Sequence, residues 1–234
     1  MIKIFNTQQI KQADEYTIKQ EPISSINLME RAANACVHQF EIDFPNNNLP
    51  IHIFCGNGNN GGDGLAIARI LLHKKKEVTV YVFEAKKYSD DFSKNFIQLK
   101  KKNKQCIHYI NDATVINNIP TQSFIIDAIF GTGLTTAINV DSIYYDVIKK
   151  INNTNFYQII SVDIPSGLFA DKTTSSICIN ANKTYTFQFP KLSFLLPESG
   201  KHVNDFTVLD IKVHPEIISK NNTTNYFITQ NDIK

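Results

Sequence analysis

Short apolar runs alternate along this chain with segments whose apolar residues recur at helical spacing. The runs are rich in Val, Ile, Phe and Tyr and predict buried strands, at 50–55, 78–83, 106–110, 123–128, 157–163, 183–189 and 206–213. Helical spacing predicts helices at 7–19, 25–40, 65–74, 90–102 and 141–151. Strands that alternate with helices are typical of a parallel sheet covered on both faces. We therefore expect a Rossmann-like, doubly wound, mostly parallel α/β fold with an N-terminal helical extension.

A glycine-rich polar segment joins the first of these strands to the next helix. Residues 56–64 read GNGNNGGDG and contain no hydrophobic side chain. A strand, a glycine loop and a helix in this order aim the helix N-terminus at an anion. Gly56, Gly58 and Gly61 also have the GxGxxG spacing of dinucleotide-binding folds. Glycine costs backbone entropy, so we expect a sharp turn that a ligand approaches closely. The alternative is a tight surface turn without a ligand.

The polar side chains of this segment fit simple pyrophosphate binding poorly. Asn59 and Asn60 offer both donors and acceptors, which suits sugar hydroxyls, an amide or a metal ion. Asp63 is placed to cap the following helix or to lie in its first turn, where the helix dipole stabilises a carboxylate. The acidic ribose partner that a dinucleotide fold places about 20 residues further on could be Glu84.

Two later strands also end in acidic residues followed by glycine turns. Asp127 precedes the sequence GTG at 131–133, and Asp163 begins the sequence DIPSG at 163–167. Ligands bind beyond the carboxyl ends of strands in such sheets, and a carboxylate is costly to bury unpaired. Each segment alone could be only a strand-ending turn. Three such segments at one sheet edge favour a site where Asp127 and Asp163 face a cation, a donor or a substrate hydroxyl.

Composition and charge narrow the class of protein. The 234 residues are 42% hydrophobic, which suffices for one compact soluble domain. A net charge of +2 gives no reason to expect nucleic acid or a membrane surface as the partner, and no apolar run approaches the ~20 residues of a membrane span. The four cysteines are scattered, as is typical of reduced thiols and not of zinc ligands or disulfides. We expect a cytoplasmic protein.

Five motifs resemble, in order, those of the NAD(P)HX epimerase family, which inverts the hydroxyl-bearing carbon of hydrated NADH or NADPH. They are EPISSINLMERAA at 21–33, NNGGDG at 59–64, Asp127 with GTG at 131–133, DIPSG at 163–167 and FPK at 189–191. The resemblance covers Met1 to about Pro215 and implies an epimerase domain over residues 1–215. Residues 216–234 are expected to form a C-terminal tail, a linker toward a missing dehydratase domain, because 226–234 resembles the entry to the dehydratase domain that bacterial relatives carry behind the epimerase. The resemblance also implies a homodimer and functional coupling to an NAD(P)HX dehydratase.

The resemblance implies roles for individual residues. The residues expected to contact the substrate through the glycine segment are Asn59, Asn60, Gly61, Gly62 and Asp63. The turn expected to hold the diphosphate through its backbone N–H groups comprises Gly131, Thr132, Gly133, Leu134, Thr135, Thr136 and Ala137. A potassium ion would bind Asn60, Asp127 and Ser166, whose amide, carboxylate and hydroxyl oxygens suit a hard cation.

The implied substrate determines the chemistry. Its hydroxyl lies on a carbon bonded to the ring nitrogen, so the nitrogen lone pair can expel it as water. The planar cation that results can take up water from either face, and these steps need an acid and a base. Asp163 would reach the hydrated ring and transfer the proton. Lys191 is the second choice, as orienter or acid, and its alternative is a solvated lysine in a turn.

Two other classes of function stay open. The same fold occurs in non-catalytic nucleotide- or RNA-related binding modules, which tend to lose the acidic residues that this chain keeps. The GxGxxG spacing also suggests an NAD-dependent dehydrogenase, but such an enzyme needs a substrate domain with a catalytic base. None of the six histidines occupies such a context. The resemblance to the epimerase family therefore implies an isomerase that acts on NADHX and NADPHX.

Overall fold

The computed structural model describes residues 1–233 and contains a seven-stranded sheet with the strand order β4-β3-β2-β5-β6-β7-β8. The strands are β2 (Ile51–Cys55), β3 (Val78–Phe83), β4 (Ile107–Ile110), β5 (Phe124–Ala128), β6 (Gln158–Val162), β7 (Lys183–Phe187) and β8 (Phe206–Leu209). Every neighbouring pair is parallel. The predicted doubly wound α/β fold is confirmed, and its main sheet is parallel throughout.

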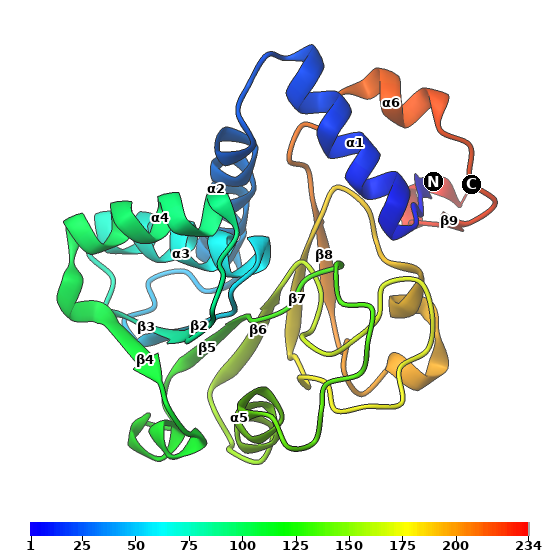
Figure 1. The fold of residues 1–234 in the computed structure, drawn as a ribbon. Helices are drawn as coiled ribbons and strands as arrows, with labels where there is room; N and C mark the ends of the chain where they lie inside the picture. The colour runs from blue at the N-terminus through cyan, green and yellow to red at the C-terminus, as the bar shows by residue number, and fades with distance from the viewer. Residues whose placement is uncertain (234) are drawn as a thin grey trace.

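Helices cover both faces of this sheet (Figure 1). On one face lie α2 (Ser25–Asp43), α3 (Asn59–His73) and α4 (Asp90–Lys102), and on the other lies α5 (Ile143–Asn152). Successive side chains of a strand point to opposite faces, so Ile51 and Ile53 of β2 belong to the core under α3 while Phe54 belongs to the core under α5. Because both faces are buried, the strands read as nearly continuous apolar runs.

The start of α3 differs from the prediction. The helix begins at Asn59, not at Leu65, so the NNGGDG motif forms its first turns and is not a loop. Gly58 occupies the N-cap position, and Asp63 lies inside the helix instead of capping it. Hydrophobic periodicity could not place this boundary, because the motif holds no apolar side chain that would carry the helical repeat.

Close packing explains two glycines of this segment. A Cβ atom at Gly56 would lie 1.9 Å from the carbonyl oxygen of Ile129, and one at Gly61 would lie 1.9 Å from the carbonyl oxygen of Gly56. No heavy atom lies within 4 Å of a Cβ placed at Gly58. The approach of one backbone to another therefore requires Gly56 and Gly61, whereas Gly58 has open space beside it.

Replacing Gly61 with alanine is expected to lower the free energy of unfolding by about 3 kcal/mol, because the backbone of Gly56 cannot move away as a flexible side chain could. Gly58→Ala is the matched control and should cost about 1 kcal/mol or less. Urea denaturation followed by circular dichroism measures both. Equal stabilities of the two variants would show that the contact between Gly56 and Gly61 does not hold α3 in place.

The strand order reverses direction between β2 and β5. From β2 the chain winds outward through β3 to β4, and then returns to the other side of β2 and continues from β5 to β8. The carboxyl ends of β2 and β5 therefore border a crevice. Open α/β sheets bind their ligands at such a point.

The N-terminal helix α1 (Thr7–Gln20) lies at the carboxyl edge of the sheet and not against one of its faces (Figure 1). Ala13 of this helix and the preceding Phe5 are buried together with Phe189, Ile211 and Val213, which follow β7 and β8. The predicted N-terminal helical extension is therefore present, and it closes over the edge at which the three strand-end motifs lie.

The last described residues fold back beside the N-terminus. Helix α6 (Pro215–Lys220) follows the main sheet, and β9 (Tyr226–Phe227) pairs antiparallel with β1 (Ile2–Lys3). The two ends of the chain consequently lie close together (Figure 1). Within residues 1–233, none of the helices has the length and apolar character needed to cross a membrane.

Candidate active site

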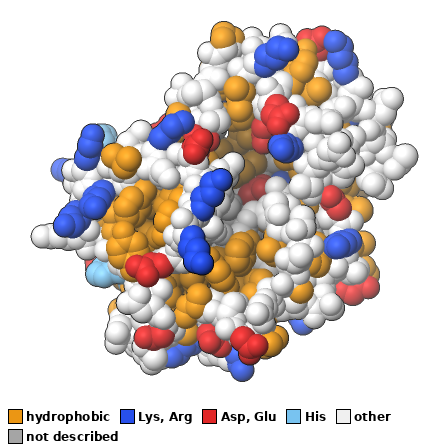
Figure 2. Space-filling model, viewed as in Figure 1, with side chains coloured by type: hydrophobic (Ala, Val, Ile, Leu, Met, Phe, Trp, Pro, Cys, Tyr) orange, Lys and Arg blue, Asp and Glu red, His pale blue; other side chains and the backbone are white. Residues whose placement is uncertain are grey.

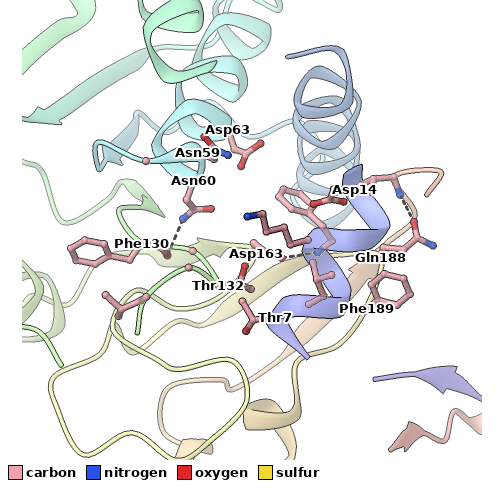
Figure 3. Close-up of a pocket in the computed structure, with 18 of the residues that line it drawn as sticks. Thr7, Asp14, Asn59, Asn60, Asp63, Phe130, Thr132, Asp163, Gln188 and Phe189 are labelled. Carbon is pink, nitrogen blue, oxygen red and sulfur yellow. Dashed lines mark hydrogen bonds between the residues drawn. The ribbon is translucent and has the colours of Figure 1, made fainter. Parts of the chain in front are cut away.

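A cavity of about 530 Å³ lies at the reversal point, between the ends of β2, β5 and β6 and the helix α1 (Figure 3). The predicted substrate-binding residues that line it are Asn59, Asn60, Asp63, Gly131, Thr132, Gly133, Leu134 and Asp163. Those absent from its lining are Gly61, Gly62, Thr135, Thr136 and Ala137. The structure thus brings the three strand-end motifs to one place.

The residues outside the lining have two kinds of surroundings. Gly61 and Gly62 are buried in α3, where a Cβ at Gly62 would come within 3.0 Å of the Met29 side chain. Residues 135–137 are exposed. Glu84, the possible ribose partner, is also exposed and does not line the cavity. Glu84 therefore cannot serve at this cavity as the acidic ribose partner that the GxGxxG pattern of Gly56, Gly58 and Gly61 requires.

Asp127 is fully buried at the end of β5, and four groups donate hydrogen bonds to it. Oδ1 accepts from the backbone N–H of Ile129 at 3.2 Å and from the hydroxyl of Ser166. Oδ2 accepts from the hydroxyl of Ser161 at 2.7 Å and from the backbone N–H of Ser166 at 2.8 Å. Burial raises the pKa of Asp127, and the four hydrogen bonds oppose that rise. This carboxylate ties β5, β6 and the turn after β6 together.

Two of the three residues predicted to bind potassium, Asn60 and Ser166, contact the carbonyl group of Phe130. The amide nitrogen of Asn60 donates to this carbonyl oxygen at 3.0 Å, and the hydroxyl oxygen of Ser166 lies 3.3 Å from it. Ser166 also contacts Asp127. An amide, a carboxylate, a hydroxyl and a backbone carbonyl are hard oxygen donors, so the residues fit a hard cation. Within residues 1–233, no cluster of three or more His, Cys, Asp or Glu side chains is arranged to hold a metal ion.

Asp163 and Lys191 form a buried ion pair beside the cavity. Nζ of Lys191 donates to Oδ1 of Asp163 at 2.7 Å and to the carbonyl oxygen of Phe189 at 3.1 Å. The Lys191 side chain is only 1% exposed, so the alternative of a solvated lysine in a turn is wrong. A buried ammonium group needs a charged partner, and the pair consequently fixes the position of the Asp163 carboxylate.

The backbone of Asp163 has an unusual conformation. Its φ of 65° lies in the left-handed region, which costs about 1 kcal/mol or more for residues other than glycine. The N–H of Asp163 donates to the carbonyl of Tyr185 at 2.8 Å, and its carboxylate accepts from the N–H of Phe187 at 3.1 Å. Contacts with β7 therefore hold Asp163 in the orientation that places it in the cavity lining (Figure 3).

Two more carboxyl groups, those of Asp14 and Asp63, line the cavity and accept no hydrogen bond from residues 1–233. Burial, followed by the negative charge of Asp163, raises the pKa of Asp14 from 3.8 to about 7, although Lys191 acts in the opposite direction. Burial, followed by the charges of Asp163, Asp14 and Asp91, raises the pKa of Asp63 well above its ordinary value. The cavity thus combines one charge-paired carboxylate with two unpaired carboxyls.

Sequence reasoning missed the part of the site that α1 supplies. Thr7, Ile10, Lys11 and Asp14 line the cavity, and their spacing of three and four residues places them on one face of the helix. This spacing is a usable signal for a shared face. It does not reveal that the face meets the sheet edge, because an amphipathic pattern fixes which residues lie together and not what they contact.

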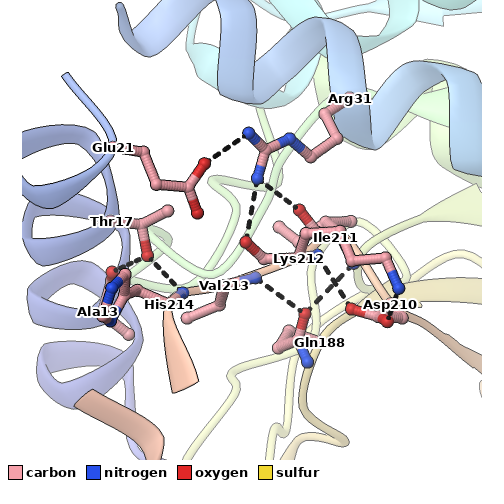
Figure 4. Close-up of polar contacts among 10 residues, drawn as sticks. All are labelled: Ala13, Thr17, Glu21, Arg31, Gln188, Asp210, Ile211, Lys212, Val213 and His214. Carbon is pink, nitrogen blue, oxygen red and sulfur yellow. Dashed lines mark hydrogen bonds and ion pairs between the residues drawn. The ribbon is translucent and has the colours of Figure 1, made fainter. Parts of the chain in front are cut away.

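A polar network holds α1 at the cavity (Figure 4). Arg31 on α2 pairs with Glu21, which follows α1, at 2.7 Å, and donates to the carbonyl of Lys212 at 2.9 Å. The backbone N–H of His214 donates to the hydroxyl of Thr17 on α1 at 2.9 Å. The network joins α1, α2 and the segment that follows β8, and it therefore fixes how closely α1 approaches the sheet edge.

The family model and the relatives with similar sequences indicate the same family. The family model described as YjeF-related protein N-terminus matches residues 25–193. The NAD(P)H-hydrate epimerase of Weissella koreensis is 32% identical over 88% of this chain and 90% of its own length. That of Oenococcus oeni is 32% identical over 89% of this chain and 96% of its own length. A protein of Moorella thermoacetica named bifunctional NAD(P)H-hydrate repair enzyme Nnr is 31% identical over 89% of this chain, but over only 40% of its own length.

A solved structure shares the fold. The crystal structure of yeast ynu0, YNL200c, matches with a TM-score of 0.73 at 22% identity and covers 88% of this chain and 87% of the yeast chain. At this identity the likeness shows the arrangement of helices and strands only.

Proposed function

The chain belongs to the family described as YjeF-related protein N-terminus, and we propose that it is an isomerase that interconverts the R and S forms of hydrated NADH and NADPH. Its relatives named NAD(P)H-hydrate epimerase match over nearly their whole length. The observation that carries the proposal is the meeting of three strand-end motifs at one cavity that also holds the Asp163 carboxylate, paired with Lys191. The reaction would serve the repair of nicotinamide nucleotides.

The cavity offers a place for each part of the substrate. The diphosphate would lie against the turn at 131–134, which faces the N-terminus of α3, because a helix N-terminus attracts negative charge. The exposed residues 135–137 would extend this contact to the rim. The side-chain amides of Asn59 and Asn60, together with Asp63, would bind polar groups of the substrate, and the hydrated ring would reach Asp163.

Proton transfer is the chemical task of the site. The ring nitrogen expels the hydroxyl as its C–O bond breaks, the leaving oxygen takes a proton, and water then adds to the planar cation while giving up a proton. Asp163 would make one of these transfers, since a carboxylate within hydrogen-bond reach can act as acid or base. Lys191, whose ammonium group donates to Asp163 at 2.7 Å, would orient that carboxylate and stabilise its charge.

Asn60, Asp127 and Ser166 would hold a potassium ion, and the backbone carbonyl of Phe130 adds a fourth oxygen atom to the same group. The donor set supports this proposal, since each of these groups carries an oxygen atom, although the Asn60 side chain must turn to aim its amide oxygen at the ion in place of the nitrogen that now donates to the carbonyl of Phe130. A bound potassium ion would supply positive charge close to the oxygen atoms of the substrate.

Partners and compartment follow from the same proposal. The bifunctional relative supports coupling to a dehydratase that consumes one of the two epimers. A homodimer associated through the N-terminal helices is proposed on the family resemblance. The four cysteines are free and buried, which fits a reducing compartment such as the cytoplasm.

The proposed activity is tested by incubating each purified epimer of NADHX with the full chain and separating the epimers by chromatography. Both incubations should reach the same mixture much faster than a protein-free control. A binding module would retain the substrate and leave the rate at that of the control. The latter result would contradict the proposed activity.

A further inference from the structure

Asp14 has no structural task that accounts for its position. Its carboxyl lines the cavity from α1, on the helix face that also carries Thr7, Ile10 and Lys11. It accepts no hydrogen bond and makes no ion pair within residues 1–233, although its side chain is partly buried. An unpaired carboxyl in such surroundings is costly. A function of Asp14 in the cavity would explain why the chain places it there.

The reaction itself calls for a second proton-transfer group. This argument rests on the proposed function. The two epimers carry the hydroxyl on opposite faces of the ring, so water leaves from one face and enters at the other. A proton-transfer group must lie within hydrogen-bond reach, directly or through one water. Asp163 approaches from the end of β6, and a carboxylate fixed there by Lys191 and the N–H of Phe187 serves only the face that it contacts.

The other carboxyls of the cavity differ in what surrounds them. The charged and titratable groups near Asp14 are Asp163 at the end of β6, Asp63 on α3, Lys191 after β7, and Lys11 and Glu15 on α1 itself. Asp163 has the Lys191 ammonium as its partner, whereas Asp14 has none. Burial and the charge of Asp163 raise the pKa of Asp14 to about 7. Asp63 lies near the start of α3 and lines the cavity from that helix.

We propose that Asp14 is the second proton-transfer residue of the site and serves the ring face turned toward α1, while Asp163 serves the face turned toward the sheet edge. Figure 3 labels both side chains at the cavity. In one direction the Asp14 carboxyl protonates the leaving hydroxyl as the C–O bond breaks and the ring nitrogen forms a C=N bond. Water then adds to the opposite face and gives its proton to the Asp163 carboxylate. The turnover moves one proton from Asp14 to Asp163, and exchange with solvent, or the reverse reaction, restores it.

Asp14→Asn in the full chain tests this role. The mechanism requires that Asp14 and Asp163 together hold one proton. Because the pKa of Asp14 is about 7, kcat/KM of the parent should fall about tenfold for each pH unit above that value. Both directions should share this profile, because no proton enters the equilibrium between the epimers. In the variant, kcat should fall by about 100-fold, KM should stay within about twofold, and the fall above pH 7 should vanish. Asp14→Glu should restore part of kcat together with the alkaline fall.

The control is Glu15→Gln, which makes the same chemical change at the next, exposed residue of α1. It should keep the rate of the parent and its alkaline fall, moved only slightly to lower pH because the charge of Glu15 is the smallest of the causes that act on the pKa of Asp14. Thermal unfolding of both variants shows whether α1 stays in place. Retention of the parental rate and alkaline fall by Asp14→Asn would overturn the assignment, and so would a rise in KM alone. If the parent itself shows no epimerisation, the proposed function fails, and the role of Asp14 fails with it.

Discussion

Replacing Asp163 with asparagine is expected to lower kcat for epimerisation by about 10³-fold, because an amide can neither take up nor release the proton that the reaction moves. The loss should appear in both directions at every pH between 5 and 9. Stopped reactions separated by chromatography measure it. Activity within a few-fold of the parent would remove Asp163 from the mechanism.

The same substitution also affects stability, and a second variant separates the two effects. Lys191 is buried with Asp163 as its partner, and removing one member of a buried ion pair costs about 3–5 kcal/mol. Some of that cost is offset because the charge of Asp163 no longer raises the pKa of Asp14 and Asp63. The double variant Asp163→Asn/Lys191→Met should regain most of the lost stability while activity stays lost. Recovery of activity in the double variant would show that misfolding, and not lost proton transfer, explains the single variant.

Replacing Asp127 with asparagine is expected to lower the free energy of unfolding by about 3 kcal/mol. Each carboxylate oxygen accepts a hydrogen bond from a backbone N–H, Oδ1 from Ile129 and Oδ2 from Ser166. Whichever oxygen becomes the amide nitrogen, a buried donor then faces another donor, and an unsatisfied buried group costs about 1–3 kcal/mol. Denaturant titration measures this change.

The proposed cation site gives Asp127→Asn a second effect. The potassium concentration that gives half-maximal activity should rise at least about tenfold, as it does when ligands of bound ions are disturbed. Ser161→Ala is the matched control, because it removes one hydrogen bond to Asp127 at 2.7 Å and none of the proposed ligands. It should lose about 1 kcal/mol of stability and keep the potassium response. A parent whose activity is the same in potassium as in choline salts would contradict the cation site.

The strands and most helices could be predicted because their surroundings are simple. A strand buried on both faces is apolar at nearly every position. The strands β2 and β5 are buried along their lengths, and each holds a single polar or charged residue, His52 and Asp127. Helix α4 was predicted at 90–102, the bounds that the structure shows, from the helical spacing of its apolar residues. In the structure Ser89 caps its start, and three lysines end it, where positive charge complements the helix dipole. At α3 the same reasoning placed the start too late, because Asn and Gly residues fill its first turns.

The part of the site at the strand ends could be predicted from the sequence. The part that depends on how α1 and the segment after β7 pack at the sheet edge could not. Asp127 and Asp163 follow apolar runs, and parallel strands bring their carboxyl ends to one edge. The burial of Lys191 could not be predicted, because a lysine after a proline is typical of an exposed turn. Only the structure shows its ion pair with Asp163. Asp14 was missed for a similar reason, since the contact of α1 with the sheet edge depends on residues such as Phe5 and Phe189, which lie far apart in the sequence.

A coupled assay tests the proposed activity most directly. A mixture of both NADHX epimers is supplied with a dehydratase specific for one epimer, either alone, with this chain, or with the Asp163→Asn variant as the matched control. With the parent chain, both epimers should be consumed at the rate of the dehydratase. With the variant or the dehydratase alone, the second epimer should disappear no faster than it does without protein. Persistence of the second epimer in the presence of the parent chain would contradict the assignment of this cavity as an epimerase site.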